Sequence, residues 1–175
     1  NTGSHVLNPR MVARHVSENR LHKKYKDARI IVAHMGGGIS ITAHIGGKIV
    51  DYCNDYMGPM SPERSGSLPS GTLVRLCYCG KYSRDEMIKK VSGQGGLTAY
   101  LGTADAVEVE NRIAGGDKYA KLIYDAMCYQ TGKKIGEIAP VFCGDIDSII
   151  FTGSLAKSQY VVNYISKMVS FIAPI

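Results

Sequence analysis

Short runs of β-branched and apolar residues, separated by glycines, mark the first third of the chain. The run Ile30–Ala33 is continuously apolar, which is typical of a buried strand. It leads through a histidine and three glycines into a second run, Ser40–Ala43, and Gly46-Gly47 separates that run from a third, Lys48–Tyr52. Because glycine turns join neighbouring strands over short distances, the pattern predicts an antiparallel three-stranded meander.

In the rest of the chain, apolar residues recur at helical spacing, and small polar residues stand where helices should begin. The longest predicted helix runs from Asp117, its N-cap, to about Ala139, and its glycines Gly132 and Gly136 suggest one face pressed close to a neighbour. Further helices are predicted at residues 9–26, with Asn8 as N-cap, and at 70–79, 83–91, 105–114 and 158–169. Residues 93–102 are predicted as a packed loop, and residues 148–152 and 171–175 as strands.

A meander followed by helices and further strands is typical of an α/β domain. We therefore predict a mixed sheet that starts with the antiparallel meander and is flanked by helices. The 175 residues are enough for one good core, so a single domain over residues 1–175 is expected. Because the chain stops on an apolar, strand-like run, we also expect it to be a fragment of a longer protein.

Charge and cysteine content narrow the class of protein. The formal net charge is +6, and the lysines and arginines are scattered without a basic run interleaved with aromatics, which favours a small phosphorylated ligand over a nucleic acid. No apolar stretch approaches the length of a membrane span, and we expect no signal peptide. The five cysteines form an odd number without zinc-type pairs, which indicates reduced thiols, a cytoplasmic protein and no metal site.

The first glycine turn is the strongest candidate for chemistry. Gly36, Gly37 and Gly38 leave no side chains in the way of a bound group and permit positive φ. Successive backbone N–H groups in such a turn form a concavity that suits phosphate oxygens, and His34 would project beside that anion. On spacing alone, an ordinary glycine hairpin with a satisfied histidine fits equally well.

The long segment 53–71 is rich in proline and glycine and is predicted to be irregular. Its apolar residues Met57, Met60 and Leu68 favour a packed loop. Within it, Arg64 stands among small residues, where its guanidinium could hold a phosphoryl group or a carboxylate with two parallel hydrogen bonds. A surface ion pair of Arg64 with Glu63 or another acid is the alternative.

Five motifs in the same order give the chain a more specific resemblance. They are His5–Asn8, His34–Ser40, Gly58–Gly66, Gly95–Asp105 and Ile149–Gly153. In these motifs the sequence resembles the butyrate kinase branch of the acetokinase family, and the resemblance covers nearly the whole chain.

The resemblance implies the ribonuclease H-like fold of actin, Hsp70 and the sugar kinases, with two lobes around a nucleotide cleft. This chain would be the C-terminal type of lobe. The implied reaction is reversible phosphoryl transfer between ATP and butyrate, or a related short-chain fatty acid, giving ADP and an acyl phosphate with Mg²⁺ as cofactor. The implied protein is a cytoplasmic homodimer or higher homo-oligomer.

The resemblance also assigns roles to individual residues. His5, His34 and Arg64 would be catalytic: His5 and Arg64 would contact the phosphoryl group in transfer, and Arg64 would also steady the carboxylate. The nucleotide and its phosphates would be bound by the glycine turn (Gly36, Gly37, Gly38), by Asp105 and by the Gly153-Ser154 turn.

The sequence departs from the family pattern at several positions. Val107 stands where the family usually has an arginine, and Ser154 where it usually has a glycine. Residues 1–4 resemble the family's phosphate turn but directly precede His5, so they are a chance match, a displaced turn or partly a cloning remnant. Acetate or branched-chain fatty acids as substrates, or a non-catalytic nucleotide-binding or dimerisation fragment, remain alternatives.

Overall fold

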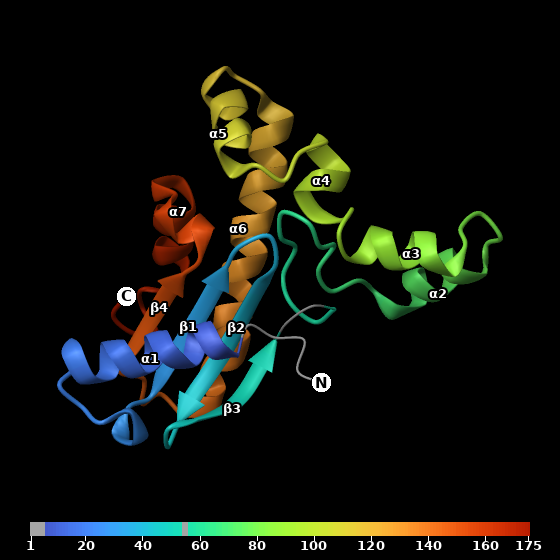
Figure 1. The fold of residues 1–175 in the computed structure, drawn as a ribbon. Coiled ribbons are helices and arrows are strands. Elements are labelled where there is room, and N and C mark those ends of the chain that lie inside the picture. Colours follow the sequence, from blue (N-terminus) through green and yellow to red (C-terminus); the bar gives the residue numbers. More distant parts are fainter. Residues whose placement is uncertain (1–5, 54–55) are drawn as a thin grey trace.

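The computed structural model describes residues 6–53 and 56–175, and a four-stranded mixed sheet lies at its centre (Figure 1). The strands lie in the order β3-β2-β1-β4 and are β1 (Ile30–Met35), β2 (Ile39–Ile45), β3 (Lys48–Cys53) and β4 (Ser148–Thr152). β1 to β3 form the predicted antiparallel meander, whereas β4 pairs in parallel with β1. The mixed sheet predicted from the sequence is confirmed.

Seven α-helices and three short 3₁₀ segments complete the described ranges. The helices are α1 (Leu7–Asn19), α2 (Ser70–Tyr78), α3 (Arg84–Val91), α4 (Gly96–Leu101), α5 (Ala106–Ala114), α6 (Lys118–Ile138) and α7 (Gln159–Val169). The 3₁₀ segments are Tyr25–Asp27, Ala139–Phe142 and Ser154–Lys157. None of the described helices is both long and apolar enough to cross a membrane.

Four helices begin at the residues that the sequence marks as caps. Ser83 and Glu86 form a reciprocal capping box ahead of α3. Asp105, Asp117 and Ser158 each accept a hydrogen bond from a backbone N–H group in the first turn of α5, α6 and α7, respectively. These local signals therefore predict the start of each helix to within one residue.

The side chains of β1 alternate between two apolar cores. Ile31 and every second residue after it belong to the larger core, which α6 and α7 cover, whereas Ile30 and Val32 belong to a smaller cluster beneath α1. Both faces of the strand are buried, which explains its continuous apolar run. The predicted close contact at Gly132 is made with α7, because a Cβ there would lie 2.7 Å from Sδ of Met168.

The first helix differs from its prediction at both ends. It begins at Leu7 with Val6 as N-cap, so Asn8 lies inside the first turn and does not cap the helix. It ends at Asn19, because the chain turns at His22, whose backbone is left-handed with φ of 52°. The prediction of a helix up to residue 26 is therefore wrong.

Two other predictions of local structure are wrong. Residues 96–101, predicted as part of a packed loop, form α4, and Leu97 is fully buried there. Residues 171–175 form no strand, although the carbonyl of Pro174 accepts one hydrogen bond from the N–H of Ile149 at 2.7 Å. A proline has no N–H group with which to extend such a ladder.

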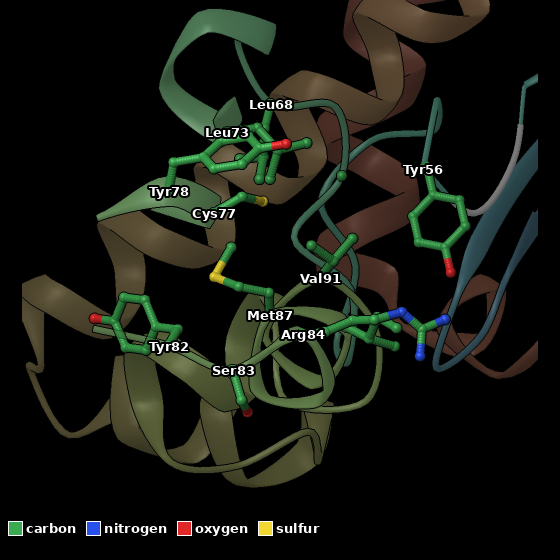
Figure 2. Close-up of a pocket in the computed structure, with 12 residues that line it drawn as sticks. Tyr56, Leu68, Leu73, Cys77, Tyr78, Tyr82, Ser83, Arg84, Met87 and Val91 are labelled. Atoms are coloured by element: carbon green, nitrogen blue, oxygen red, sulfur yellow. The ribbon is translucent and has the colours of Figure 1, made fainter. Parts of the chain in front are cut away.

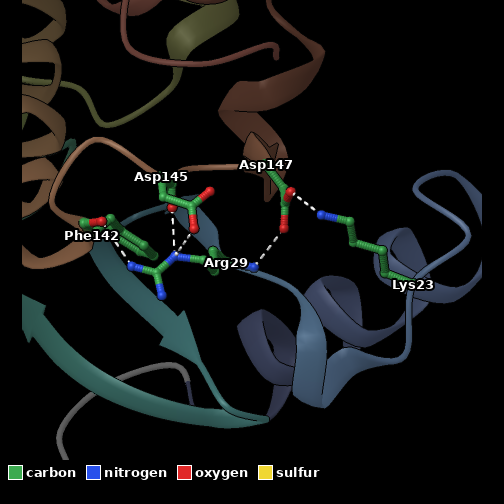
Figure 3. A network of polar contacts seen from close by, with 5 residues as sticks. All are labelled: Lys23, Arg29, Phe142, Asp145 and Asp147. Carbon is green, nitrogen blue, oxygen red and sulfur yellow. Dashed lines mark hydrogen bonds and ion pairs between the residues drawn. The ribbon is translucent and has the colours of Figure 1, made fainter.

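Charged side chains join the amino ends of the parallel strands β1 and β4 (Figure 3). The carboxylate of Asp147 accepts hydrogen bonds from Nζ of Lys23 at 2.5 Å and from the backbone N–H of Arg29 at 2.9 Å. The Arg29 guanidinium in turn donates to the carbonyls of Asp145 and Phe142, at 2.6 and 2.8 Å. These contacts hold the two strands together at the end opposite the candidate site.

Candidate functional site

The candidate site lies where β1 and β4 end. In their parallel pairing His34 lies opposite Thr152, so the glycine turn after β1 and the Gly153-Ser154 turn after β4 are neighbours. Gly153 has φ of +93°, and a Cβ on it would lie 2.4 Å from the carbonyl oxygen of Met35. Only glycine fits this close approach of the two strand ends.

The three glycines after β1 are needed for space. None of them lies in the left-handed region, so the expectation that they supply positive φ is wrong. Instead, a Cβ on Gly37 would lie 3.1 Å from Cδ and Oε2 of Glu63, and a Cβ on Gly38 would lie 2.5 Å from Cζ and Nη1 of Arg64. The turn therefore lets two neighbouring charged side chains of another loop approach its backbone.

The loop that carries Arg64 is fastened to the glycine turn by its own backbone. The hydroxyl of Ser61 and the N–H of Glu63 both donate to the carbonyl of Gly37, at 2.8 and 3.0 Å. The side chain of Arg64 is partly buried, and its backbone forms an antiparallel bridge with Ser92. The Arg64 guanidinium is therefore partly buried against the glycine turn and is not a fully exposed surface group.

Only part of this loop is packed as predicted. Met60 is 4% exposed, whereas Met57 is 62% and Leu68 is 41% exposed. The packed portion is therefore the stretch next to the glycine turn.

His34 is held by a residue that sequence reasoning assigned to another role. Nδ1 of His34 lies 3.0 Å from Oδ1 of Asn8, and the same oxygen accepts a hydrogen bond from the Thr152 hydroxyl at 3.3 Å. Since an amide oxygen only accepts, His34 donates from Nδ1. Its Nε2 lies 3.7 Å from the position that a Cβ would take on Gly36, so this nitrogen faces the turn. His5 lies outside the described residues.

A pocket of about 540 Å³ opens beside the two turns. Four of the predicted nucleotide-binding residues line it, namely Gly36, Gly37, Asp105 and Ser154. Gly38, Gly153, His34 and Arg64 lie next to these residues in the sequence or in contact with the turn, but do not line the pocket themselves. The structure thus gathers the predicted phosphate turn and the two predicted nucleotide contacts around one cavity.

On the far side of the pocket, Asp105 and Val107 come from the start of α5. The carboxylate of Asp105 accepts a hydrogen bond from the N–H of Val107 at 2.9 Å. The side chain of Val107 is 67% exposed. It therefore presents an apolar surface at the pocket, at the position where the family resemblance leads us to expect an arginine.

Glu110 is a pocket residue that sequence reasoning missed. Its Oε1 accepts hydrogen bonds from the hydroxyls of Tyr124 at 2.9 Å and of Ser158 at 2.5 Å. Burial, followed by this carboxylate, raises the pKa of the Tyr124 hydroxyl, which keeps that hydroxyl a hydrogen-bond donor. The helical spacing of Glu110 resembles that of any solvated acid, so the sequence offers no signal for this contact.

A second pocket of about 540 Å³ lies between α2, α3 and the preceding loop (Figure 2). It is mainly apolar, with Leu73 and Cys77 from α2, Met87 and Val91 from α3, and Leu68 from the loop. No residue of α2 is buried, so this pair of helices projects from the body of the molecule, as Figure 1 also shows. None of the predicted site residues lines this pocket.

No resident metal site is evident in the described ranges. Among residues 6–53 and 56–175, no three His, Cys, Asp or Glu side chains group closely enough to hold an ion. A divalent cation in this pocket would therefore need ligands that a bound substrate supplies.

Comparisons with known proteins agree with the motifs. A family model described as the acetokinase family matches residues 2–172. The chain is 51% identical over 173 residues to butyrate kinase 2 of Clostridium acetobutylicum, covering 98% of the chain and 48% of that protein. It is 54% identical over 174 residues to a probable butyrate kinase 2 of Caldanaerobacter subterraneus subsp. tengcongensis, covering 98% of the chain and 49% of that protein.

Solved structures of related kinases share the fold. An acetate kinase of Porphyromonas gingivalis superposes with a TM-score of 0.85 at 28% identity, over 93% of the chain and 42% of that protein. A propionate kinase of Francisella tularensis gives a TM-score of 0.85 at 26% identity, over 97% of the chain and 44% of that protein. The predicted actin, Hsp70 and sugar-kinase fold is confirmed by these neighbours, and the chain spans about half the length of the curated relatives it matches. The chain belongs to the acetokinase family.

Proposed function

We propose that the protein containing this chain is an ATP-dependent kinase of short-chain carboxylates, with butyrate as the preferred acceptor. The observation that carries the proposal is the convergence of the glycine turn, Ser154 and Asp105 on one pocket, with the Arg64 guanidinium packed on Gly38 at its edge. The choice of butyrate rests on the names of relatives that are 51% and 54% identical. In this proposal the chain is the C-terminal type of lobe.

The pocket suggests how the nucleotide would lie. The phosphates would reach the backbone of Gly36 and Gly37, while the adenosine would extend toward Asp105 and Ser154. Because glycines carry no side chains of their own, the backbone of the turn would then be able to approach phosphate oxygens closely, as in nucleotide-binding turns at the ends of parallel strands. Mg²⁺ would enter with the nucleotide, because magnesium is commonly held by a few carboxylates together with substrate phosphates.

In this proposal, Arg64 and His34 act on the group in transfer. Phosphoryl transfer depends almost entirely on positioning and on stabilising the charge that spreads over the equatorial oxygens. The Arg64 guanidinium would stabilise that charge and align the carboxylate. His34, which Asn8 orients through Nδ1, would offer Nε2 to the phosphate path, and His5 is proposed to contact the same group.

The proposed protein is a cytoplasmic homodimer or higher homo-oligomer, as the family resemblance implies. Its oligomeric state can be measured by light scattering of the purified protein. A monomer at micromolar concentration would contradict this part of the proposal.

The activity can be tested directly. A protein that contains this chain within the full length of its relatives should form acyl phosphate from butyrate and MgATP, trapped as the hydroxamate. Acetate, propionate and isobutyrate serve as parallel acceptors, and kcat/KM should be highest for butyrate. No acyl phosphate with any of the four acids would contradict the proposed function, whereas a preference for another acid would contradict only the acceptor. The 175-residue chain alone should be inactive, because half of the relatives' length has no counterpart in it.

A further inference from the structure

Glu63 is an acidic side chain at the edge of a pocket proposed to receive phosphates. A Cβ on Gly37 would lie 3.1 Å from its Cδ and Oε2, so the carboxylate packs against the turn itself. The backbone of Glu63 is tethered there, since its N–H donates to the carbonyl of Gly37 at 3.0 Å. Its own carbonyl accepts from the N–H groups of Gly93 at 2.8 Å and Gly95 at 3.0 Å. The backbone of Glu63 is therefore fixed by three hydrogen bonds, one to the glycine turn and two to residues 93 and 95.

The other acids that line the pocket are engaged elsewhere. Asp105 caps α5, and Glu110 accepts from the hydroxyls of Tyr124 and Ser158. By contrast, no hydrogen bond or ion pair reaches the carboxylate of Glu63 from the described ranges. Among the described residues, Glu63 is thus the pocket acid whose carboxylate makes neither a hydrogen bond nor an ion pair.

The negative charge of the Glu63 carboxylate should weaken the binding of metal-free phosphates and strengthen the binding of phosphates that carry Mg²⁺. Metal-free phosphate oxygens at Gly37 would lie within a few ångströms of a like charge, which weakens binding by a factor of about ten or more at short range. A phosphate group that carries Mg²⁺ would instead bring a cation whose preferred ligands are carboxylate and phosphate oxygens. The carboxylate would then favour binding.

We propose that Glu63 makes the pocket select the magnesium complex of the nucleotide over the metal-free nucleotide. The proposal rests on the proposed function, because it takes the glycine turn as the phosphate site. It assigns to Glu63 a role in specificity, distinct from the contact that Arg64 makes with the group in transfer.

Equilibrium binding tests the proposal without relying on catalysis. ATP affinity is measured by titration calorimetry, with excess Mg²⁺ and with excess EDTA, in a protein that contains this chain at the full length of its relatives. The variant is Glu63→Gln, which keeps the size of the side chain and all three backbone hydrogen bonds. The matched control is Glu18→Gln, which removes the same charge from an exposed position on α1, where Glu18 pairs with Arg14. Thermal unfolding of each variant confirms that it is folded.

The wild-type protein should bind MgATP more tightly than free ATP. In Glu63→Gln that ratio should fall about tenfold, mainly because free ATP binds more tightly. Glu18→Gln should keep the wild-type ratio. If both forms bind and Glu63→Gln leaves their ratio unchanged, or weakens both equally, Glu63 does not select the magnesium complex. If the wild-type protein binds neither form, the nucleotide site itself is wrong, and the role of Glu63 is refuted with it.

Discussion

The two ends of the parallel pair β1 and β4 are built from opposite kinds of residue. At the amino ends, Asp147 accepts from Lys23 and from the backbone of Arg29, so charged groups satisfy one another. At the carboxyl ends, the strands lead into the glycine turn and the Gly153-Ser154 turn, and Gly36, Gly37 and Ser154 of these turns line the pocket. We call the amino ends of the two strands the closed end, because side chains fill it. We call the carboxyl ends the open end, because a pocket lies beside it.

A buried histidine adds to the closed end. His44 on β2 lies opposite Ile30, the first residue of β1, and is fully buried. Its Nδ1 lies 2.7 Å from the Tyr25 hydroxyl and its Nε2 lies 2.8 Å from the Thr42 hydroxyl. Burial, and to a lesser extent the positive charge of Arg10, lower the pKa of His44 to about 4.

The two ends of this strand pair therefore have different roles: the amino end contributes to stability, and the carboxyl end to ligand binding. In open α/β sheets, ligands bind beyond the carboxyl ends of the strands, so that end must keep unfilled space and strand-end backbone. The amino end carries no such requirement and can be filled with paired charges. Substitutions at the amino end should therefore change stability and its pH dependence, whereas substitutions at the carboxyl end should change ligand binding and catalysis.

The largest effect is expected at Arg64, on the open end. In a complete enzyme, Arg64→Ala should lower kcat by about 10³-fold, because an arginine on the developing phosphoryl charge acts mainly in the transition state. Its ATP affinity and thermal stability should change little. Arg14→Ala, at an exposed pair with Glu18 on α1, is the control and should keep kcat. A kcat of Arg64→Ala within about threefold of the parent would return Arg64 to a surface ion pair.

The next effect is expected at His44, on the closed end. Its lowered pKa means that the unfolded chain binds a proton between about pH 6.5 and 4 that the folded chain does not. Stability from this group is complete above pH 6.5 and is lost as the pH falls toward 4. The loss should be on the order of 3 kcal/mol, measured by urea unfolding at a series of pH values.

The matched variants for this measurement are His44→Gln and His15→Gln, the latter at an exposed position on α1. His44→Gln should be less stable at neutral pH and should lose less stability on acidification. His15→Gln should follow the wild-type curve. If the free energy of unfolding falls with pH in the same way for all three proteins, the buried His44 ring does not cause the loss of stability at low pH.

A substitution at Gly38 would fill space at the open end. A methyl group there would lie 2.5 Å from Cζ of Arg64, so Gly38→Ala should push the guanidinium away from the turn. A displacement of about 1 Å can cost about 10²-fold in rate, and we expect kcat to fall by about that factor. Gly136→Ala on α6, where a Cβ meets nothing within 4 Å, is the control. Unchanged kcat in folded Gly38→Ala would mean that the position of Arg64 at the turn is not needed.

The smallest effect is expected at Asp147. Burial by itself raises the pKa of this carboxyl, but the hydrogen bonds from Lys23 and Arg29 outweigh it and leave the pKa below its usual value. Its contribution to stability is therefore present above the unfolded pKa of about 4 and is lost as the pH falls through the lower folded value. Asp147→Asn should cost about 1 kcal/mol at pH 7 and should leave nucleotide affinity unchanged. If Asp147→Asn changes nucleotide affinity without changing stability, the assignment of stability to the amino end and ligand binding to the carboxyl end is wrong.

The sequence by itself determined the features that depend on near neighbours in the chain. The meander followed from apolar runs joined by glycine turns, and the starts of α3, α5, α6 and α7 followed from caps that bond within their own first turn. The family motifs identified His34, Arg64 and Asp105 as candidates. Each of these signals lies within a few residues, where backbone geometry alone relates pattern to structure.

Only the tertiary structure decided which distant residues meet. Asn8 was predicted as a cap because asparagine favours that position, but its side chain bonds to Thr152, 144 positions away, and to His34. The glycines of the turn were expected to supply positive φ and room for a bound group, but none has positive φ, and Gly37 and Gly38 leave room for Glu63 and Arg64. These contacts arise when separate segments pack together, and the spacing of residues along one segment contains no information about the side chains that another segment will bring against it.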